Sequence, residues 1–429
     1  MRLLNTTSPD FEAGFAALLI RAQTAPALSA AVADIIARVR AEGDAALLDY
    51  TRQFDRLEME ASGLRVPQSA IAAALARQPT ELRDALELAA ARIKTFHEAQ
   101  LPRDFESVDA TGATTGLRWG ALDAVGLYVP GGKAAYPSSV LMNAIPARVA
   151  GVERIAMTVP APGGVLNPLV LAAAGIAGVD EIYQIGGAQA VAALAYGTAS
   201  IRPVDRIVGP GNAYVAEAKR QVFGQVGIDS IAGPSEVLIL ADEANDPRHV
   251  ALDLLAQAEH DEDAQSILIT TNAAFAAAVQ NAVMSALSNL TRAPIAAESW
   301  RRHGGIILVR GWDEAVTLAN RIAPEHLQLM LDDPAPIFRQ IRHAGAVFLG
   351  RHTPEAMGDY VAGPNHVLPT SGTARFASGL SVYDFMKRTT YVGLTPEALS
   401  ALGPAAITLA TAEGLTAHAG SVAIRIPKA

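Results

Sequence analysis

The sequence predicts an α/β protein with two Rossmann-like, parallel-sheet domains, a small N-terminal helical segment and a C-terminal helical tail domain. The first observation is that β-branched apolar runs alternate with helical patterns between residues 124 and 349, as in successive strand-helix units of a parallel sheet. The second is a weak repeat, Val-acid-x-Ile, that opens apolar runs at Val152, Val179 and Val204. This spacing fits one strand, one turn and one helix per repeat, although chance matches of so short a pattern are the alternative.

Length and composition narrow the class of protein. The chain has 429 residues, half of them apolar, which suffices for two or three domains. A net charge of −9 without a long Lys/Arg block argues against nucleic acid as a partner. The apolar stretch 165–179 is interrupted by Asn167 and Pro168, and Asp10 and Glu12 come early, so we expect neither a membrane span nor a secretory signal, and a cytoplasmic location. The absence of cysteine excludes disulfides, thiolate metal ligands and a cysteine nucleophile.

The elements follow in chain order. Apolar residues recurring three or four positions apart predict helices over 31–39, 45–54, 70–76 and 82–96. The run 124–129 predicts the first strand, and the three repeats follow it. A second series predicts strands over 237–240, 267–270, 305–309, 327–331 and 346–349, with helices between them that include 249–259 and 274–287.

We expect four parts in the chain. Residues 1–25 form the N-terminal helical segment. Residues 26–127 and 236–380 form a discontinuous first α/β domain, in which the early helices cover the later sheet. Residues 128–235 form the second α/β domain, and residues 381–429 form the tail.

Glycine-rich turns follow the predicted strands of the second domain, at 128–133, 186–190 and 209–214. In open parallel sheets ligands bind beyond the carboxyl ends of the strands. None of the three turns is a G-x-G-x-x-G or a Walker loop. Each nevertheless opens a predicted helix whose N-terminus favours an anion, so a nucleotide is one interpretation and ordinary structural turns are the other.

Candidate metal ligands fall on a helix and on loops. Gln257 and His260 are three residues apart and therefore share a helix face. Asp359, His366 and His418 stand in Gly-flanked contexts. Nitrogen and oxygen ligands suit zinc, although a glutamine amide is an atypical ligand and a plain polar helix face is the alternative.

Glu325 and His326 precede a predicted strand and form a candidate acid/base pair. A histidine titrates near neutral pH, and a glutamate becomes a useful base when burial or a partner raises its pKa. A capped turn with solvated charges would also account for the two residues.

Six sequence blocks together resemble histidinol dehydrogenase, and the resemblance extends from the early helices to the tail. The blocks are V-G-L-Y-V-P-G-G at 125–132, G-G-A-Q-A at 186–190, V-G-P-G-N at 208–212, A-G-P-S-E at 232–236, A-P-E-H at 323–326 and E-G-L-T-A-H at 413–418. The resemblance implies a zinc-dependent homodimer that oxidises L-histidinol to L-histidine through L-histidinal. This reaction uses two NAD⁺ and makes up the last two steps of histidine biosynthesis.

The resemblance also implies roles for residues of this chain. The implied NAD residues, in the domain 128–235, are Tyr128, Gln189 and Asn212. The implied ligands of one zinc ion per subunit are Gln257, His260, Asp359 and His418. The implied substrate residues are Ser235, Gln257, His260, His326, Asp359, Glu413 and His418. Glu325 and His326 are implied proton acceptors, and the tail is implied to bring Glu413 and His418 to the site of the partner subunit.

The chemistry of the residues fits this resemblance. Because the chain has no cysteine to attack an aldehyde, we expect water to add to it directly. Our hypothesis is that His326 takes the alcohol proton in the first oxidation and Glu325 activates water in the second. The metal would hold the imidazole and amino nitrogens of the substrate. His366 either lines the pocket or supports the ligand Asp359, or else only packs its loop.

Two alternatives remain at this point. A relative with the same fold could oxidise another alcohol, such as a sulfonated diol, and Ser235, Glu413 and His418 argue for histidinol instead. A catalytically silent zinc- and nucleotide-binding protein is the second alternative, and the intact pair of Glu325 and His326 argues against it.

Overall fold

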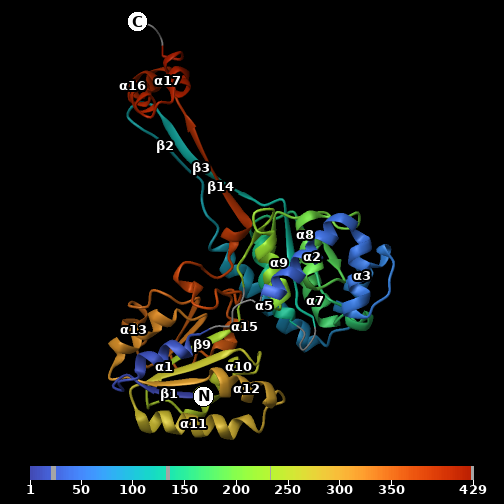
Figure 1. Ribbon diagram of the computed structural model, residues 1–429, viewed down its shortest axis with the longest axis vertical. Coiled ribbons are helices and arrows are strands. Elements are labelled where there is room, and N and C mark those ends of the chain that lie inside the picture. The colour runs from blue at the N-terminus through green and yellow to red at the C-terminus, as the bar shows by residue number, and fades with distance from the viewer. Residues whose placement is uncertain (21–25, 132–135, 232, 427–429) are drawn as a thin grey trace.

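The computed structural model describes residues 1–20, 26–131, 136–231 and 233–426. Strands within these residues form two parallel sheets and one three-stranded antiparallel sheet (Figure 1). Each parallel sheet is the centre of its own α/β unit, which confirms the predicted fold class. No helix among the described residues is long and apolar enough to cross a membrane.

The first α/β unit along the chain is built on a five-stranded parallel sheet of order β6-β5-β4-β7-β8. Its strands are β4 (Ala124–Tyr128), β5 (Arg154–Thr158), β6 (Glu181–Tyr183), β7 (Arg206–Val208) and β8 (Gly227–Ile228). Its crossover helices are α6 (Pro137–Val149), α7 (Pro168–Ile176), α8 (Gly187–Tyr196) and α9 (Ala213–Val222). The strand order reverses between β4 and β7, the place where doubly wound sheets open a crevice for a ligand.

The second unit repeats this order and adds one strand at the edge, β1-β11-β10-β9-β12-β13. Its strands are β1 (Arg2–Asn5), β9 (Glu236–Ala241), β10 (Gln265–Thr270), β11 (Gly305–Leu308), β12 (His326–Met330) and β13 (Ala346–Leu349). The helices of its region are α10 (Pro247–Ala258), α11 (Ala273–Leu287), α12 (Ala293–His303), α13 (Trp312–Ile322), α14 (Ala335–Phe338) and α15 (Glu355–Tyr360). Every residue of β9, β10 and β12 is buried, because helices cover both faces of the sheet.

The early helices pack on the five-stranded sheet, so the expected grouping of 26–127 with 236–380 is wrong. They are α2 (Pro26–Glu42), α3 (Asp44–Asp55), α4 (Gln68–Ala76) and α5 (Thr80–Glu98), and they contact α6, α7, α8 and α9. Val32 and Leu47 share one hydrophobic cluster with Val191. Helices α7 and α8 are rich in alanine, and these small side chains let a further layer of helices approach closely. The expected boundary at 127/128 also falls inside β4.

The N-terminal segment is only partly helical. Arg2–Asn5 forms β1, which pairs in parallel with β11, and α1 (Phe11–Leu18) follows it. Phe11, Phe15 and Leu18 are buried against the six-stranded sheet. A four-residue edge strand carries too few residues to show an alternating pattern.

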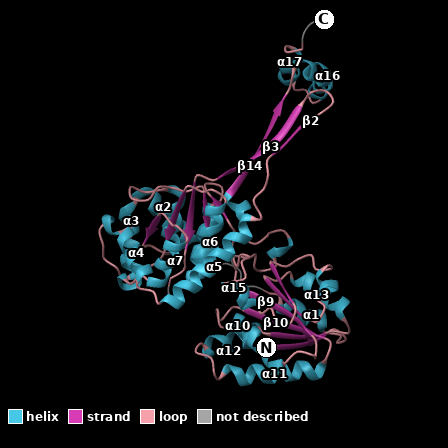
Figure 2. Ribbon diagram, turned by 180° about the vertical axis from the view of Figure 1, so that it is seen from behind, coloured by secondary structure: helices cyan, strands magenta, loops and turns pink. Residues whose placement is uncertain are grey.

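An antiparallel arm extends from the body and carries the last helices. It consists of β2 (Phe105–Val108), β3 (Thr114–Ala121) and β14 (Met386–Gly393). Figure 2 shows these strands side by side, leading away from both parallel sheets to α16 (Pro396–Ala412) and α17 (Thr416–Ala423). The expected helical tail is therefore confirmed for its last two helices, but its start is a strand. Seven of the eight residues of β14 are exposed, so no buried face imposes an apolar pattern that sequence could reveal.

The buried ion pair of Lys219 and Asp229 holds the turn after β7. Gly209 donates its N–H to Asp229 Oδ2 (2.8 Å), and its carbonyl accepts from Lys219 Nζ (3.0 Å). Gly209 has φ +109°, and a Cβ here would lie 2.2 Å from the Tyr128 carbonyl oxygen. Both the backbone conformation and the close approach to β4 therefore require glycine.

We expect Lys219→Met to lower the free energy of unfolding by about 3–5 kcal/mol, because it leaves Asp229 as a buried, unpaired charge. Urea denaturation would measure the change. Lys94→Met is the matched control, since Lys94 makes only an exposed pair with Glu98 (3.5 Å), and it should leave the denaturation midpoint nearly unchanged. Adding Asp229→Asn to Lys219→Met should recover part of the loss; a further additive loss would contradict the unpaired-charge explanation.

Candidate functional site

Glu325 and His326 lie buried at the amino end of β12, with 5% and 4% of their surface exposed. Both are bonded to the backbone of Glu236 in the neighbouring strand: the Glu236 N–H donates to Glu325 Oε2 (2.8 Å), and His326 Nδ1 lies 3.0 Å from the Glu236 carbonyl oxygen. A carbonyl can only accept, so Nδ1 carries the proton and Nε2 is the free acceptor of the neutral ring. His326 Nε2 is buried without a hydrogen-bond partner among the described residues.

Burial disfavours the charged form of both side chains and therefore shifts both pKa values. It raises the pKa of Glu325 well above its usual value, although the Glu236 N–H acts in the opposite direction. It lowers the pKa of His326, so the imidazole is neutral at pH 7. The solvated-turn alternative for this pair is thereby excluded, because neither side chain faces water.

The predicted metal ligands Gln257, His260 and Asp359 come from two helices that contact each other. Gln257 is in α10, His260 follows the end of α10, and Asp359 is in α15. Gln257 is fully buried, and neither its amide oxygen nor its nitrogen has a partner in the described part of the chain. His260 Nε2 lies 3.9 Å from Asp359 Oδ2. Burial lowers the pKa of His260, which keeps the ring in the neutral form that binds metal. An orphaned buried amide beside an imidazole and a carboxylate fits a bound cation.

Glu355 is a candidate that sequence analysis missed. Ligand atoms of His326, Glu355 and Asp359 lie within 4.8 Å of one another. Burial raises the pKa of Glu355 to about 8. The available signal was its position four residues before Asp359, which places both carboxylates on one face of α15.

His366 contacts Asp359, one of the predicted metal ligands. Its Nδ1 lies 3.1 Å from the Asp359 carbonyl oxygen and its Nε2 3.4 Å from Ser139 Oγ in α6. Burial lowers its pKa to about 4, so the ring stays neutral. His366 thus stands between Asp359 and the other α/β unit, and a supporting role remains a prediction.

The predicted cofactor residues lie at the carboxyl end of the five-stranded sheet: Tyr128 ends β4, Gln189 is in α8 after β6, and Asn212 precedes α9 after β7. The Gly187 N–H donates to the Tyr128 hydroxyl (3.1 Å), which joins two of the turns. Gln189 is buried, and its Oε1 has no partner among the described residues. Asn212 caps α9, with Oδ1 accepting from the backbone of the next turn. Gly132 and Lys133 of the first predicted turn lie outside the described residues.

The remaining predicted residues are placed differently. Ser235 directly precedes β9, and its carbonyl accepts from Gln265 N (2.9 Å). Glu413 and His418 belong to the tip of the arm, and Figure 1 shows α17 far from β9 and α15. A single chain therefore does not bring these two residues to the others.

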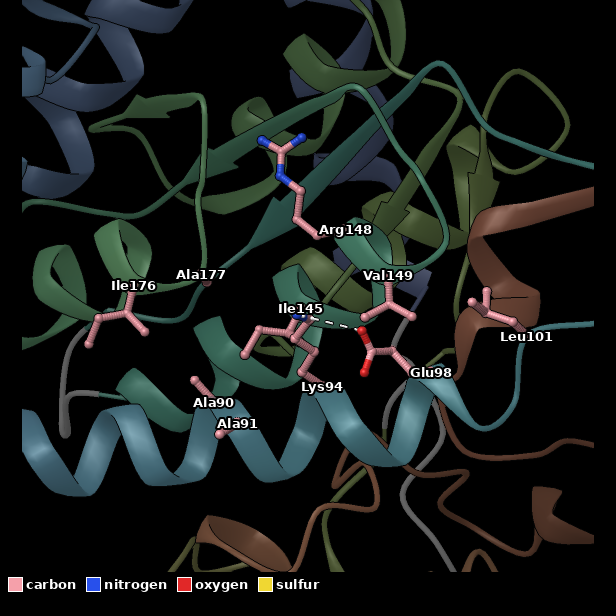
Figure 3. Close-up of a pocket in the computed structure, with 10 residues that line it drawn as sticks. All are labelled: Ala90, Ala91, Lys94, Glu98, Leu101, Ile145, Arg148, Val149, Ile176 and Ala177. Atoms are coloured by element: carbon pink, nitrogen blue, oxygen red, sulfur yellow. Dashed lines mark ion pairs between the residues drawn. The ribbon is translucent and has the colours of Figure 1, made fainter.

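One surface cavity of about 430 Å³ lies elsewhere, between α5, α6 and α7 (Figure 3). Its lining includes the exposed pair of Lys94 and Glu98, and it contains none of the predicted site residues. The cavity therefore does not mark the candidate site.

Two doubly wound sheets, one presenting cofactor-type turns and the other a buried acid/base pair beside metal-type ligands, define a two-domain α/β oxidoreductase. The model of the family "Histidinol dehydrogenase" matches residues 20–426. The histidinol dehydrogenases of Gluconobacter oxydans and Rhodospirillum rubrum are 62% and 60% identical, covering 100% and 99% of this chain and 100% and 98% of their own lengths. The crystal structure of histidinol dehydrogenase from Elizabethkingia anophelis superposes with a TM-score of 0.94 at 36% identity, over 99% of this chain and 98% of that chain. The chain belongs to the histidinol dehydrogenase family.

With zinc as the ion that the family resemblance implies, we expect His260→Ala and Asp359→Ala to weaken its binding by more than about 100-fold, and Glu355→Gln by about 10- to 100-fold, the cost of losing a supporting residue. Competition with a chromophoric chelator would measure the affinities. If Glu355→Gln lost the ion while His260→Ala kept it, the ion would instead sit among His326, Glu355 and Asp359.

Proposed function

We propose that the protein is a zinc-dependent, NAD-linked histidinol dehydrogenase that oxidises L-histidinol to L-histidine through L-histidinal, in the last two steps of histidine biosynthesis. The observation that carries the proposal is the buried pair of Glu325 and His326 beside orphaned metal-type ligands, in a chain of this family.

The donor set supports one zinc ion per subunit. Gln257, His260 and Asp359 would hold it, and His418 would complete the set. The bound ion would position the imidazole and amino nitrogens of the substrate and supply positive charge near the reacting carbon. Ser235, Glu413 and these ligands would surround the substrate.

The turns after β4, β6 and β7 support NAD binding. Tyr128 ends β4, Gln189 lies in the first turn of α8 after β6, and Asn212 caps α9 after β7, so all three are at the carboxyl end of the sheet. Bound NAD⁺ would accept the hydride in each oxidation. Because backbone N–H groups at helix N-termini favour anions, these turns suit the pyrophosphate without a G-x-G-x-x-G motif.

In the first oxidation His326 takes the alcohol proton. Its Nε2 is the free acceptor, because Nδ1 donates to the Glu236 carbonyl. The lowered pKa of His326 keeps the ring unprotonated and ready to act as a base at neutral pH.

In the second oxidation Glu325 activates the water that adds to the aldehyde. Its raised pKa brings the carboxylate closer to the proton affinity that a general base needs. Direct addition of water is the route open to a chain without cysteine. The hydrate then loses hydride and proton to give the carboxylic acid.

We further propose a homodimer in which the arms exchange. Large apolar side chains of α16 and of the residues next to α17 are exposed in the single chain, namely Leu402, Leu409, Leu415 and Ile424. Such a surface fits contact with a second subunit. The exchange would bring Glu413 and His418 into the site of the partner subunit.

An absorbance assay at 340 nm tests the reaction. We expect two NADH per limiting histidinol from the wild-type enzyme, with activity lost on chelation and restored by zinc. Glu325→Gln should release one NADH and slow the aldehyde step by about 100-fold or more. Near-normal production of the second NADH by Glu325→Gln would contradict the role of Glu325.

Co-expression of Glu325→Gln with His418→Ala tests the shared site. Each heterodimer would contain one intact site, so a random mixture should recover about a quarter of the wild-type rate of histidine formation, although each variant alone would form little histidine. If each chain supplied its own His418, the mixture would stay as inactive as its components.

A further inference from the structure

Asp55, the last residue of α3, is a buried carboxylate that the proposed mechanism leaves unused. Only 8% of its surface is exposed, and its Oδ2 has no hydrogen-bond partner among the described residues. The carboxyl accepts from the Ala161 N–H, but burial still raises its pKa. A buried acceptor without a donor is costly and is typical of a place where a ligand supplies the donor.

The position of Asp55 in the fold points to a dinucleotide. Ala161 follows β5, the second strand of the sheet order 3-2-1-4-5 that the five-stranded sheet shares with doubly wound dinucleotide-binding folds. In those folds an acidic residue after the second strand binds the ribose hydroxyls of NAD. Here Val159, Pro160 and Ala161 follow β5 and carry no acid. Asp55 brings a carboxylate to this place from a helix outside the sheet.

Asp55 also adjoins the turns that we assign to the cofactor. Gly131 and Gly186 pack against Pro160 so closely that a Cβ on them would lie 2.6 Å and 2.5 Å from its ring. The turns after β4, β5 and β6 therefore meet at Pro160. Burial raises the pKa of Tyr128 to about 12, and the charge of Asp55 adds to this shift, so the two side chains are neighbours.

We propose that Asp55 accepts the hydrogen bonds of the adenosine-ribose hydroxyls of NAD⁺ and thereby selects NAD⁺ over NADP⁺. This inference rests on the NAD dependence proposed above. A 2′-phosphate would meet the negative charge of Asp55 in a buried place, whereas a 2′-hydroxyl would satisfy it. Asp55 is thus a specificity-determining residue at a distance from the acid/base pair.

Equilibrium binding, measured by calorimetry with the zinc-loaded protein, tests the proposal. We expect Asp55→Asn to weaken NAD⁺ binding about tenfold, because a hydrogen bond to a charged group becomes one to a neutral group. NADP⁺ binding should stay the same or strengthen, so the preference for NAD⁺ narrows. Asp49→Asn is the matched control, since Asp49 lies on the same helix and pairs with Arg38 at the surface (2.6 Å).

A second measurement does not depend on how a variant folds: the affinity of the wild-type protein for 2′-deoxy-NAD⁺, the analogue that lacks the 2′-hydroxyl of the adenosine ribose. The analogue should bind the wild-type protein about tenfold more weakly than NAD⁺ does. To Asp55→Asn, the analogue and NAD⁺ should bind with equal affinity. An equal loss of NAD⁺ and NADP⁺ affinity in Asp55→Asn, or full affinity for the deoxy analogue, would overturn the role of Asp55 while leaving the proposed function intact. If the wild-type protein bound no NAD⁺ at all, the proposed function itself would fail.

Discussion

The backbone of Glu236 is the point on which the candidate site depends. Its N–H holds the Glu325 carboxylate and its carbonyl holds the His326 ring, while its own side chain accepts from Ser371 N (3.0 Å). Because His326 pairs with Val237 in the ladder between β12 and β9, the central strands of the sheet set the orientation of both groups. An acid/base pair held this way loses little freedom when a substrate binds, since its geometry is already determined by the sheet.

The two α/β units use opposite ends of their sheets, and one loop region connects them. Cofactor-type turns lie at the carboxyl ends of β4 and β7, whereas the acid/base pair lies at the amino end of β12. The loop after α15 joins the two, because Asn365 Nδ2 donates to the Met142 carbonyl (2.6 Å). A displacement of this loop would therefore move His366, and change its contact with Asp359 at the end of α15.

Sequence reasoning succeeded where a residue's environment is local and failed where it depends on distant packing. Most strands of both parallel sheets were predictable, because burial on both faces produces apolar runs such as β9, whereas the short edge strands β1 and β8 were missed. The partner of the early helices was not, since an apolar face such as that of α2 fits any apolar layer. Strand β14 was missed because its exposed residues carry no pattern. Gln257 and His260 were found from their spacing, but Glu355 and Asp55 became candidates only when burial without enough partners became visible.

The arm has a consequence for how the chain folds during its synthesis. Its two outer strands are made early and late, β2 at Phe105–Val108 and β14 at Met386–Gly393, and β3 pairs with both. Until β14 has left the ribosome, β3 has one open edge, which is a surface for pairing with other chains. Strand β1 waits in the same way for β11, some 300 positions later. Both the six-stranded sheet and the arm therefore contain an early strand that must wait for a partner made much later, and their assembly is completed late in the folding of the chain.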